Sequence, residues 1–268
     1  MRDLLFEPIR INRMEIKNRI YMPAMHLNMA QKFEVTDPLV DFYAERARGG
    51  AGMIAVGYAT VDEFSGSAAN IGAHADAFIP GLARLAAAIR ENGARAVLQI
   101  NHAGRYNFSF FIDGRQPVAP SAVASRMTGE TPRALELDEI PEVIGRFAAA
   151  ARRAQQAGYD GVEVLAGTGY LISEFLSPLT NQRTDAYGGP LTNRMRFGLE
   201  VIEAVRGADF LLLVTEPTPF GLHDLRLAAE VASELRIPSG VVINRDGIGD
   251  GGVDAFCAAA GLGILMRI

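Results

Sequence analysis

The sequence predicts an α/β fold, a TIM-barrel-like parallel (β/α) assembly that is incomplete, with about seven strands. Three observations support this prediction. Short β-rich apolar runs alternate with longer Ala- and Leu-rich runs of helical periodicity, as in a parallel sheet or barrel. Several helical runs end at a glycine, which suits the left-handed position just past a helix. Polar residues collect where the predicted strands end. With 268 residues, the chain can bury a large core as one barrel or as two smaller domains.

The predicted elements alternate along the whole chain, and the strands number one fewer than a complete eight-stranded barrel requires. The predicted strands are residues 19–25, 52–61, 95–104, 161–167, 209–215, 239–245 and 263–268. The predicted helices are residues 40–50, 79–93, 141–160, 191–207, 222–235 and 251–261. A long loop is expected between the fourth strand and the fourth helix.

The composition narrows the possible partners. The 26 basic and 31 acidic residues give a net charge of −5, and no long basic run occurs, which disfavours nucleic acid or an anionic membrane as a partner. No apolar run approaches the ~20 residues that span a bilayer, and the start of the chain has no signal-peptide pattern. We therefore expect a cytoplasmic protein that acts on a small molecule. The sequence does not indicate an oligomeric state.

Cysteine content limits the metal and disulfide chemistry. Cys257 is the single cysteine, so an internal disulfide, a structural zinc site and an iron–sulfur cluster lack the thiols they need. The sequence predicts no metal site.

A group of residues, most of them polar, lies at or just past the carboxyl ends of the first four predicted strands. In a parallel barrel the carboxyl ends of the strands form the active-site face, so these residues would converge. Any one of them alone could equally be a hydrogen-bonded strand-end residue. The group comprises Met25, His26, Tyr58, Thr60, Gln99, Asn101, His102, Arg105, Thr168 and Tyr170.

Three segments carry a family resemblance. They are "NRIYMPAMH", "LQINHAGRY" and "YDGVEVLAGTGYLISEFLSPLTNQRTDAYGGPLTNRMRFGLEVIEAVR". They resemble the old yellow enzyme family of FMN-dependent ene-reductases, and most closely its 2,4-dienoyl-CoA reductase and trimethylamine dehydrogenase branch. The resemblance covers residues 1–206, which we expect to form a partial flavoenzyme barrel. It implies FMN as cofactor, NAD(P)H as reductant and an activated alkene as hydride acceptor.

The resemblance also implies roles for individual positions. The family's usual histidine pair, which holds the substrate carbonyl, is replaced here by Leu165 and Thr168. The dienoyl-CoA reductase branch also lacks that pair and has its proton-donating tyrosine where Tyr170 stands. The positions that would contact the flavin are Pro23, Ala24, Met25, Gly57, Tyr58 and Gln99, of which Gln99 would hydrogen-bond the pyrimidine edge.

Reduction of an alkene requires a hydride at one carbon and a proton at the other. A phenol, with a pKa of about 10, stays protonated at neutral pH and can donate that proton, so Tyr170 is the predicted donor. A strand-capping tyrosine is the alternative. We assign His26 a catalytic role and assign His102, Arg105 and Thr168 to substrate binding. Each histidine could instead be a hydrogen bonder behind the site.

The segment "NQRTDAYGGPLTNRMRF" is expected to be structural. Gly188 and Gly189 would allow a turn, Arg183 and Asp185 would hold the loop, and Asn193 would cap the following helix.

The segment from residue 201 resembles the later part of a MinD-type P-loop ATPase. We expect residues 207–268 to form a Rossmann-like, P-loop-type βαβαβ unit, in which Asn244 matches an asparagine near the nucleotide base. The chain contains no G-x-x-x-x-G-K-[ST] motif, so ATP hydrolysis is not expected. "GIGDGG" at 247–252 is expected to be a turn, and Arg245 and Arg267 are candidate phosphate ligands. The alternative function is a non-catalytic chimera or fragment without a cofactor, or a nucleotide-linked interaction module.

Overall fold

The computed structural model describes residues 4–11, 13–205, 211–234, 238–249 and 251–267. The backbone divides into two compact units. One is Ile20–Arg206, and the other combines Met1–Arg19 with Gly207–Ile268. Each unit has its own parallel sheet.

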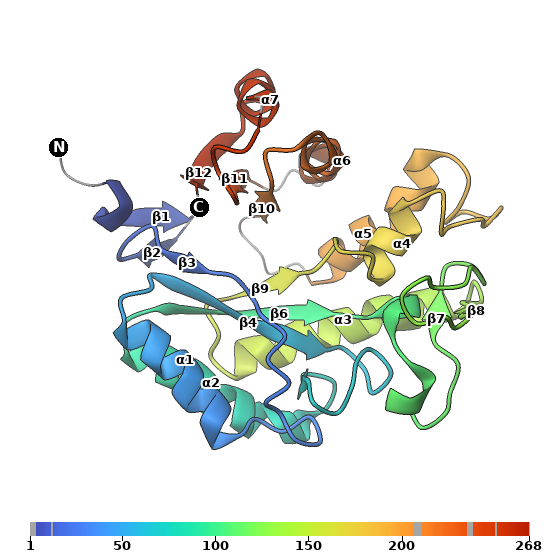
Figure 1. Cartoon of the computed structure of the whole chain (residues 1–268), viewed down its shortest axis with the longest axis horizontal. Helices are drawn as coiled ribbons and strands as arrows, with labels where there is room; N and C mark the ends of the chain where they lie inside the picture. The colour runs from blue at the N-terminus through green and yellow to red at the C-terminus, as the bar shows by residue number, and fades with distance from the viewer. Residues whose placement is uncertain (1–3, 12, 206–210, 235–237, 250, 268) are drawn as a thin grey trace. The chain divides into compact units, whose positions relative to one another are not determined.

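The unit Ile20–Arg206 is built on a parallel sheet with the strand order β3-β4-β6-β9, and β5 pairs with β4. Helices α1, α2 and α3 lie on one face of this sheet (Figure 1). The strands are β3 (Tyr21–Met22), β4 (Met53–Thr60), β5 (Ile71–Gly72), β6 (Arg95–Asn101) and β9 (Gly161–Val164), with a small pair β7 (Val118–Ala119) and β8 (Arg133–Ala134). The helices are α1 (Asp37–Arg48), α2 (Ile79–Glu91), α3 (Glu139–Gln156), α4 (Leu171–Leu176) and α5 (Leu191–Ala204), with 3-10 turns η2 (Asp76–Phe78), η3 (Gly104–Tyr106) and η4 (Ser109–Phe111).

The main strands of this sheet lie side by side in the order in which they occur along the chain. This order is typical of a (β/α) barrel, whereas a doubly wound sheet reverses its strand order at a switch point. It also places the carboxyl ends of β3, β4, β6 and β9 along one edge.

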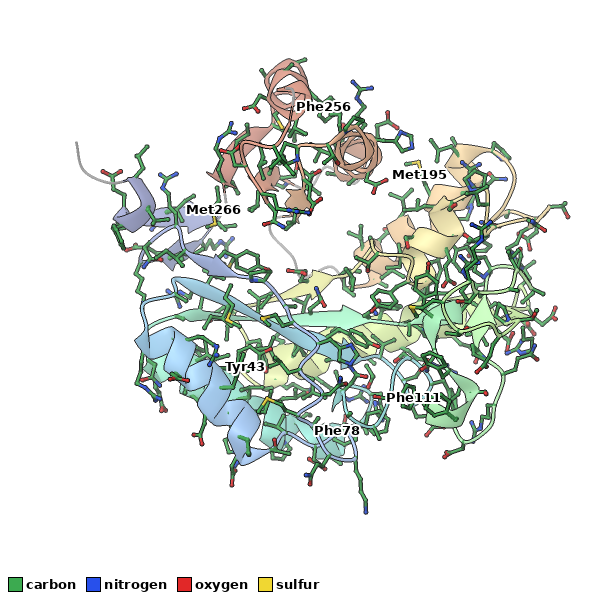
Figure 2. All side chains as sticks on the ribbon, in the orientation of Figure 1. Tyr43, Phe78, Phe111, Met195, Phe256 and Met266 are labelled. Carbon is green, nitrogen blue, oxygen red and sulfur yellow. The ribbon has the colours of Figure 1, made fainter. Side chains whose placement is uncertain are left out.

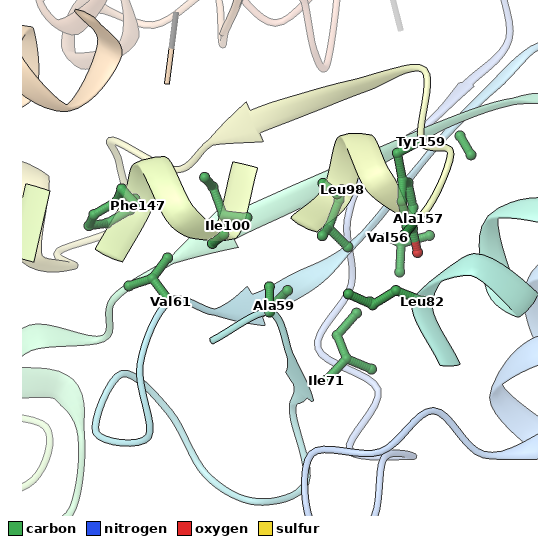
Figure 3. Close-up of a cluster of buried hydrophobic side chains, with 14 of the residues drawn as sticks. Val56, Ala59, Val61, Ile71, Leu82, Leu98, Ile100, Phe147, Ala157 and Tyr159 are labelled. Atoms are coloured by element: carbon green, nitrogen blue, oxygen red, sulfur yellow. The ribbon is translucent and has the colours of Figure 1, made fainter. Parts of the chain in front are cut away.

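The core of this unit lies between the sheet and its helices. Alternate residues of β4 and β6 point to this side, so that Val56, Leu98 and Ile100 are fully buried. Figure 3 shows them against Leu82 of α2 and Phe147 of α3. Each buried apolar side chain of this size contributes about 1.5–3 kcal/mol through removal of its surface from water.

A β-bulge interrupts the pairing of β4 with β6. Val56 pairs with Leu98 and Ala59 pairs with Ile100, so two residues of β4, Gly57 and Tyr58, face the single residue Gln99. The peptide bond between the two bulged residues is cis. Because one residue is extra, Ala59 returns to the helix side of the sheet and joins the core.

Gly57 can occupy the bulge because it has no side chain. Its φ is +153°, and a Cβ at this position would lie 2.9 Å from both the Cβ and the carbonyl oxygen of Gln99. Tyr43 of α1 (labelled in Figure 2) belongs to the same core, and its phenol hydrogen-bonds the Gly57 backbone. The bulge is therefore held from the helix side as well as by the neighbouring strand.

The second unit carries the remaining elements. Its parallel sheet has the order β10-β11-β12, and β1 and β2 form a separate antiparallel pair. Its core contains Leu225, Val241, Ile243, Val253 and Cys257. The elements are η1 (Leu4–Phe6), β1 (Ile9–Ile11), β2 (Met14–Ile16), β10 (Leu211–Thr215), α6 (Pro219–Glu234), β11 (Ser239–Ile243), α7 (Gly252–Ala260) and β12 (Gly263–Arg267).

All seven predicted strands and all six predicted helices occur, with shifted ends. The first strand ends at Met22, since Pro23 has no N–H to continue the ladder. Helix α4 lies within the segment predicted as a loop. In the part of the chain that the structure describes, the seven predicted strands are divided between two parallel sheets and do not form one closed barrel.

The loop before α5 is structural, as predicted. The guanidinium of Arg183 pairs with the Asp185 carboxylate at 2.5 Å, and Gly189 has a φ of +79°. The prediction that Asn193 caps α5 is wrong. Pro190 occupies the cap position, and its carbonyl oxygen already accepts the Asn193 N–H at 3.0 Å, so Asn193 lies inside the first turn of the helix.

The start of the segment 247–252 agrees with the expected turn, whereas Gly252 begins α7. Asp246 and Gly247 form a turn, and Gly247 has a φ of +91°. The position of Asp250 lies outside the described residues. Among the helices that the structure describes, none is both long and apolar enough to cross a membrane.

We predict that Gly57→Ala destabilises the protein by about 2 kcal/mol or more, because the new methyl group meets Gln99 and the backbone is held at positive φ. The matched control is Gly145→Ala in α3, where an added Cβ meets no atom within 4 Å. This change should stabilise the protein by up to about 1 kcal/mol, since alanine favours a helix more than glycine does. Urea unfolding measures the stability of both variants. Equal stability of the two would contradict the close approach of position 57 to Gln99.

Candidate active site

Aromatic side chains from three strand ends meet at the carboxyl edge of the larger sheet. The ring centroids of His26 and Tyr58 lie 5.3 Å apart, and those of Tyr58 and Tyr170 lie 5.7 Å apart. Tyr106 adds a fourth ring, 6.2 Å from Tyr170. All of these pairs are edge-to-face, an arrangement that aromatic rings favour. The structure thus brings together three residues that the sequence placed at the site.

The two central phenols hold their protons firmly. Tyr58 is 6% exposed, and burial, with a further contribution from Tyr170, raises the pKa of its phenol above the ordinary value. Burial also raises the pKa of the half-buried Tyr170. Because removal of a proton would create a charge in a poorly solvated place, both remain neutral donors across the physiological pH range.

His26 has a defined tautomer in its neutral form. The Asn70 side-chain oxygen accepts the Ser67 N–H at 3.0 Å, so the Asn70 amide nitrogen must face the other way. That nitrogen lies 3.1 Å from Nε2 of His26 and donates to it. Neutral His26 therefore carries its proton on Nδ1, which is the nitrogen left to donate to another partner.

Gln99 is 8% exposed and lies beside the bulge. Its amide nitrogen donates to Oε1 of Glu163 at 2.5 Å, and the Tyr21 hydroxyl donates to Oε2 of the same carboxylate at 2.6 Å. Gln99 and Tyr58 are also neighbours across the bulge, so the amide and the ring cluster belong to one site. The described residues leave the carbonyl oxygen and the second N–H of Gln99 for another partner.

His102 is engaged entirely within the protein. It is 2% exposed, its Nδ1 accepts the Gly104 N–H at 3.0 Å, and its Nε2 lies 3.5 Å from Oδ2 of Asp62. Burial lowers the pKa of the imidazole, although Asp62 opposes this effect. This geometry favours the alternative interpretation, a hydrogen bonder behind the site, over substrate binding.

Asp62 connects this histidine to the helix layer. Burial acts to raise its pKa, but His102, the Arg146 guanidinium at 2.9 Å and the Phe64 N–H together hold the pKa of the carboxyl below its ordinary value. Arg105 is also turned to structural partners, because its guanidinium donates to the carbonyl oxygens of Val123 and Ala124.

The remaining predicted residues lie around this edge. Thr168 is exposed with a φ of +58°. Met25 is 48% exposed and, with His26, Gly57 and Tyr58, lines a small pocket. Pro23 and Ala24 follow β3 without regular secondary structure.

Two carboxylates near the site, Glu163 and Glu174, are not among the residues that the sequence predicted. Glu163 interrupts the apolar strand "GVEV", and Glu174 interrupts the apolar helix "LISEFL", so a charge inside each apolar run was the available signal. Glu174 is 1% exposed, and burial raises its pKa to about 8. Its Oε1 accepts the Arg105 N–H at 3.0 Å, whereas its Oε2 has no partner among the described residues.

The family model of the NADH:flavin oxidoreductase / NADH oxidase family matches residues 4–213. The chain belongs to this family. The matched range includes the residues expected to contact the flavin, the expected proton donor Tyr170 and the residues expected to bind the substrate.

Named relatives agree with this assignment. A "metal reductase" of Desulforamulus reducens is 50% identical over 215 residues, which are 79% of this chain and 32% of that protein. An "NADPH dehydrogenase" of Clostridium acetobutylicum is 40% identical over 205 residues, or 75% of this chain and 59% of that protein. The chain therefore spans about a third of the length of the first relative and under two thirds of the second.

Solved structures show the fold. Morphinone reductase in complex with tetrahydroNAD matches with a TM-score of 0.83 and 30% identity, over 95% of this chain and 77% of that one. An old yellow enzyme homologue from Zymomonas mobilis matches with a TM-score of 0.78 and 26% identity, over 99% of this chain and 88% of that one. These matches continue beyond residue 213, so the structural likeness to old yellow enzymes includes the segment that we expected to be of ATPase type.

We predict that His102 makes stability depend on pH. Its pKa is lowered in the folded protein, so below pH 6.5, the ordinary value, the unfolded chain takes up a proton that the folded chain does not. Stability therefore falls as the pH falls, by up to about 1.4 kcal/mol per pH unit for this one proton. His102→Asn keeps an acceptor for Gly104 and should reduce the slope between pH 7.5 and 5.5 in urea unfolding.

The control for this slope is His223→Asn, since His223 is exposed on α6. An unchanged slope in His102→Asn, or an equal change in both variants, would show that His102 is not the group responsible.

Proposed function

We propose that this chain carries the catalytic region of an FMN-dependent, NAD(P)H-linked oxidoreductase of the ene-reductase type. The observation that carries the proposal is the convergence of Tyr170, Tyr58 and Gln99 at one sheet edge. A hydrogen-bonding amide and a neutral phenol there suit recognition of a ring cofactor and protonation of a substrate beside it. Membership of the flavin oxidoreductase family supports the same chemistry.

The residues present fit a flavin. Gly57 brings bare backbone to the strand edge, and the Gln99 amide offers a donor and an acceptor side by side. Asn101, two residues further along β6, is 1% exposed, and its side-chain nitrogen has no partner among the described residues. We assign the flavin contacts to Pro23, Ala24, Met25, Gly57, Tyr58 and Gln99.

When bound, reduced flavin supplies the hydride. Tyr170 carries the proton for the second carbon of the alkene on its hydroxyl group. The raised pKa of the phenol keeps it protonated until it donates this proton to the substrate. Its ring is positioned between those of Tyr58 and Tyr106. His26, through Nδ1–H, can donate a hydrogen bond to a developing negative charge on the substrate.

Residues 207–268 are proposed to continue the parallel α/β architecture without taking part in the chemistry. Arg267 pairs with Asp246 at 3.0 Å and with Asp254, and Arg245 lies 3.8 Å from Glu216. Both candidate phosphate ligands therefore already face carboxylates. The resemblance of this segment to a P-loop ATPase gains no support from the comparisons, and we do not propose nucleotide hydrolysis.

We predict that the purified chain binds FMN. An absorbance scan should show a flavin spectrum, directly or after addition of FMN, and NAD(P)H should bleach it. A colourless protein that unfolds cooperatively but does not titrate with FMN would instead favour a non-catalytic fragment or chimera.

We predict that Tyr170→Phe slows reoxidation of the reduced enzyme by an activated alkene such as 2-cyclohexenone about 100-fold, because general acid catalysis is lost. Reduction of the flavin by NADH should be unchanged, since it needs no proton from this residue. Stopped-flow absorbance separates the two half-reactions. Tyr106→Phe is the matched control, and an equal loss in both variants would argue against Tyr170 as the donor.

A further inference from the structure

We propose that Glu163, held by Tyr21, is a positioning residue that fixes the orientation of the Gln99 amide for flavin recognition. The inference rests on the proposed function and adds two residues that the family resemblance does not assign. It concerns a chain of hydrogen bonds from the Tyr21 hydroxyl, through the Glu163 carboxylate, to the Gln99 amide.

The three side chains come from three strands and share one face of the sheet. Gln99 of β6 and Glu163 of β9 are direct register partners, so their side chains point to the same side. Val162 and Val164, which flank Glu163, pack against the core on the helix side, which places Glu163 on the opposite face. Tyr21 belongs to β3, yet its hydroxyl reaches Glu163 at 2.6 Å.

Donor and acceptor roles along this chain have one solution. Burial, followed by the charge of Glu163 and the hydrogen bond to it, raises the pKa of Tyr21, so its hydroxyl keeps its proton and donates. A carboxylate only accepts. The amide nitrogen of Gln99, and not its oxygen, must therefore face Glu163.

The consequence for a ligand follows from the geometry of an amide. Rotation by 180° about the last side-chain bond exchanges the oxygen and nitrogen of glutamine at almost no steric cost. A ligand that needs a donor and an acceptor in fixed places would then find only part of the population competent. With Glu163 accepting one N–H, Gln99 presents its carbonyl oxygen and second N–H in one arrangement, which suits the N3–H and a neighbouring carbonyl of the flavin pyrimidine.

A second consequence is electrostatic. Reduced flavin carries additional negative charge on its pyrimidine ring, and a carboxylate directly behind the contacting amide disfavours this charge. Glu163 should therefore lower the midpoint potential of the bound cofactor, and its neutralisation should raise that potential.

The test compares Glu163→Gln, Tyr21→Phe and the double variant with the unmodified chain. Glu163→Gln keeps the size of the side chain but can accept or donate at either end, so the Gln99 amide is free to flip. We expect the FMN dissociation constant, from quenching of flavin fluorescence, to rise about tenfold, as for the loss of one oriented hydrogen bond. Tyr21→Phe should raise it less, and the double variant should match Glu163→Gln, because both changes act through one chain.

The chain offers a matched control in the same unit. The Tyr187 hydroxyl donates to Oε2 of Glu200 at 2.7 Å, a pair of the same chemistry that involves neither Gln99 nor the sheet edge. Tyr187→Phe and Glu200→Gln should change the unfolding free energy and leave the dissociation constant and the potential of FMN unchanged. Urea unfolding of each apoprotein shows that all variants are folded.

The possible outcomes separate the two proposals. If the unmodified chain binds FMN and both Glu163→Gln and Tyr21→Phe bind it with the same affinity and potential, the inference is overturned and the proposed function stands. If the Glu200 control shows the same loss as Glu163→Gln, the effect reflects general stability, and the inference is also overturned. If the unmodified chain binds no FMN, both proposals fail together.

Discussion

The close approach of Gly57 to Gln99 is the constraint on which the site depends. Because β4 places two residues against one residue of β6, the strand keeps its core register on both sides of the bulge. The extra residue is Tyr58, whose ring meets that of Tyr170 from the loop after β9. The bulged residues Gly57 and Tyr58 therefore affect both the packing of the core and the geometry of the site. A side chain at position 57 would disturb both together.

The two buried carboxyl groups Asp62 and Glu174 differ in how completely their oxygens are paired. Asp62 has partners for its carboxylate in Arg146 and the Phe64 N–H and stays ionised, which is the usual condition for a charge removed from water. Glu174 has one N–H for Oε1 and none among the described residues for Oε2, so burial dominates and its pKa rises to about 8. Asp62 therefore stabilises the loops by charge pairing. Glu174 fills the space beside Gly104, where a Cβ would meet its carboxyl oxygens.

The strands and the meeting of Tyr58 with Tyr170 could be predicted from sequence, because apolar periodicity marks parallel strands and their carboxyl ends share an edge. The hydrogen-bond partners of the site residues could not be predicted from the sequence. The contact of Tyr21 with Glu163 depends on the order and register of three strands, which no local pattern records. The error at Asn193 has a local cause, because the Pro190 carbonyl oxygen accepts the first hydrogen bonds of the helix and Asn193 lies inside that turn. The apolar periodicity of the sequence therefore locates the helices and strands. Which side chains contact one another at the site depends on how the strands pair.

The residues with proposed chemical roles all lie inside the part of the chain that the family model matches. Every residue proposed to contact the flavin or to donate the proton lies within Ile20–Arg206, which is inside the family match of residues 4–213. Beyond that match the likeness to old yellow enzymes is structural. A parallel βα unit needs an apolar strand and an amphipathic helix rather than particular side chains, so many sequences can supply it. The cations of this segment, such as Arg267, are already paired with carboxylates, and binding of an anion there would first have to displace them.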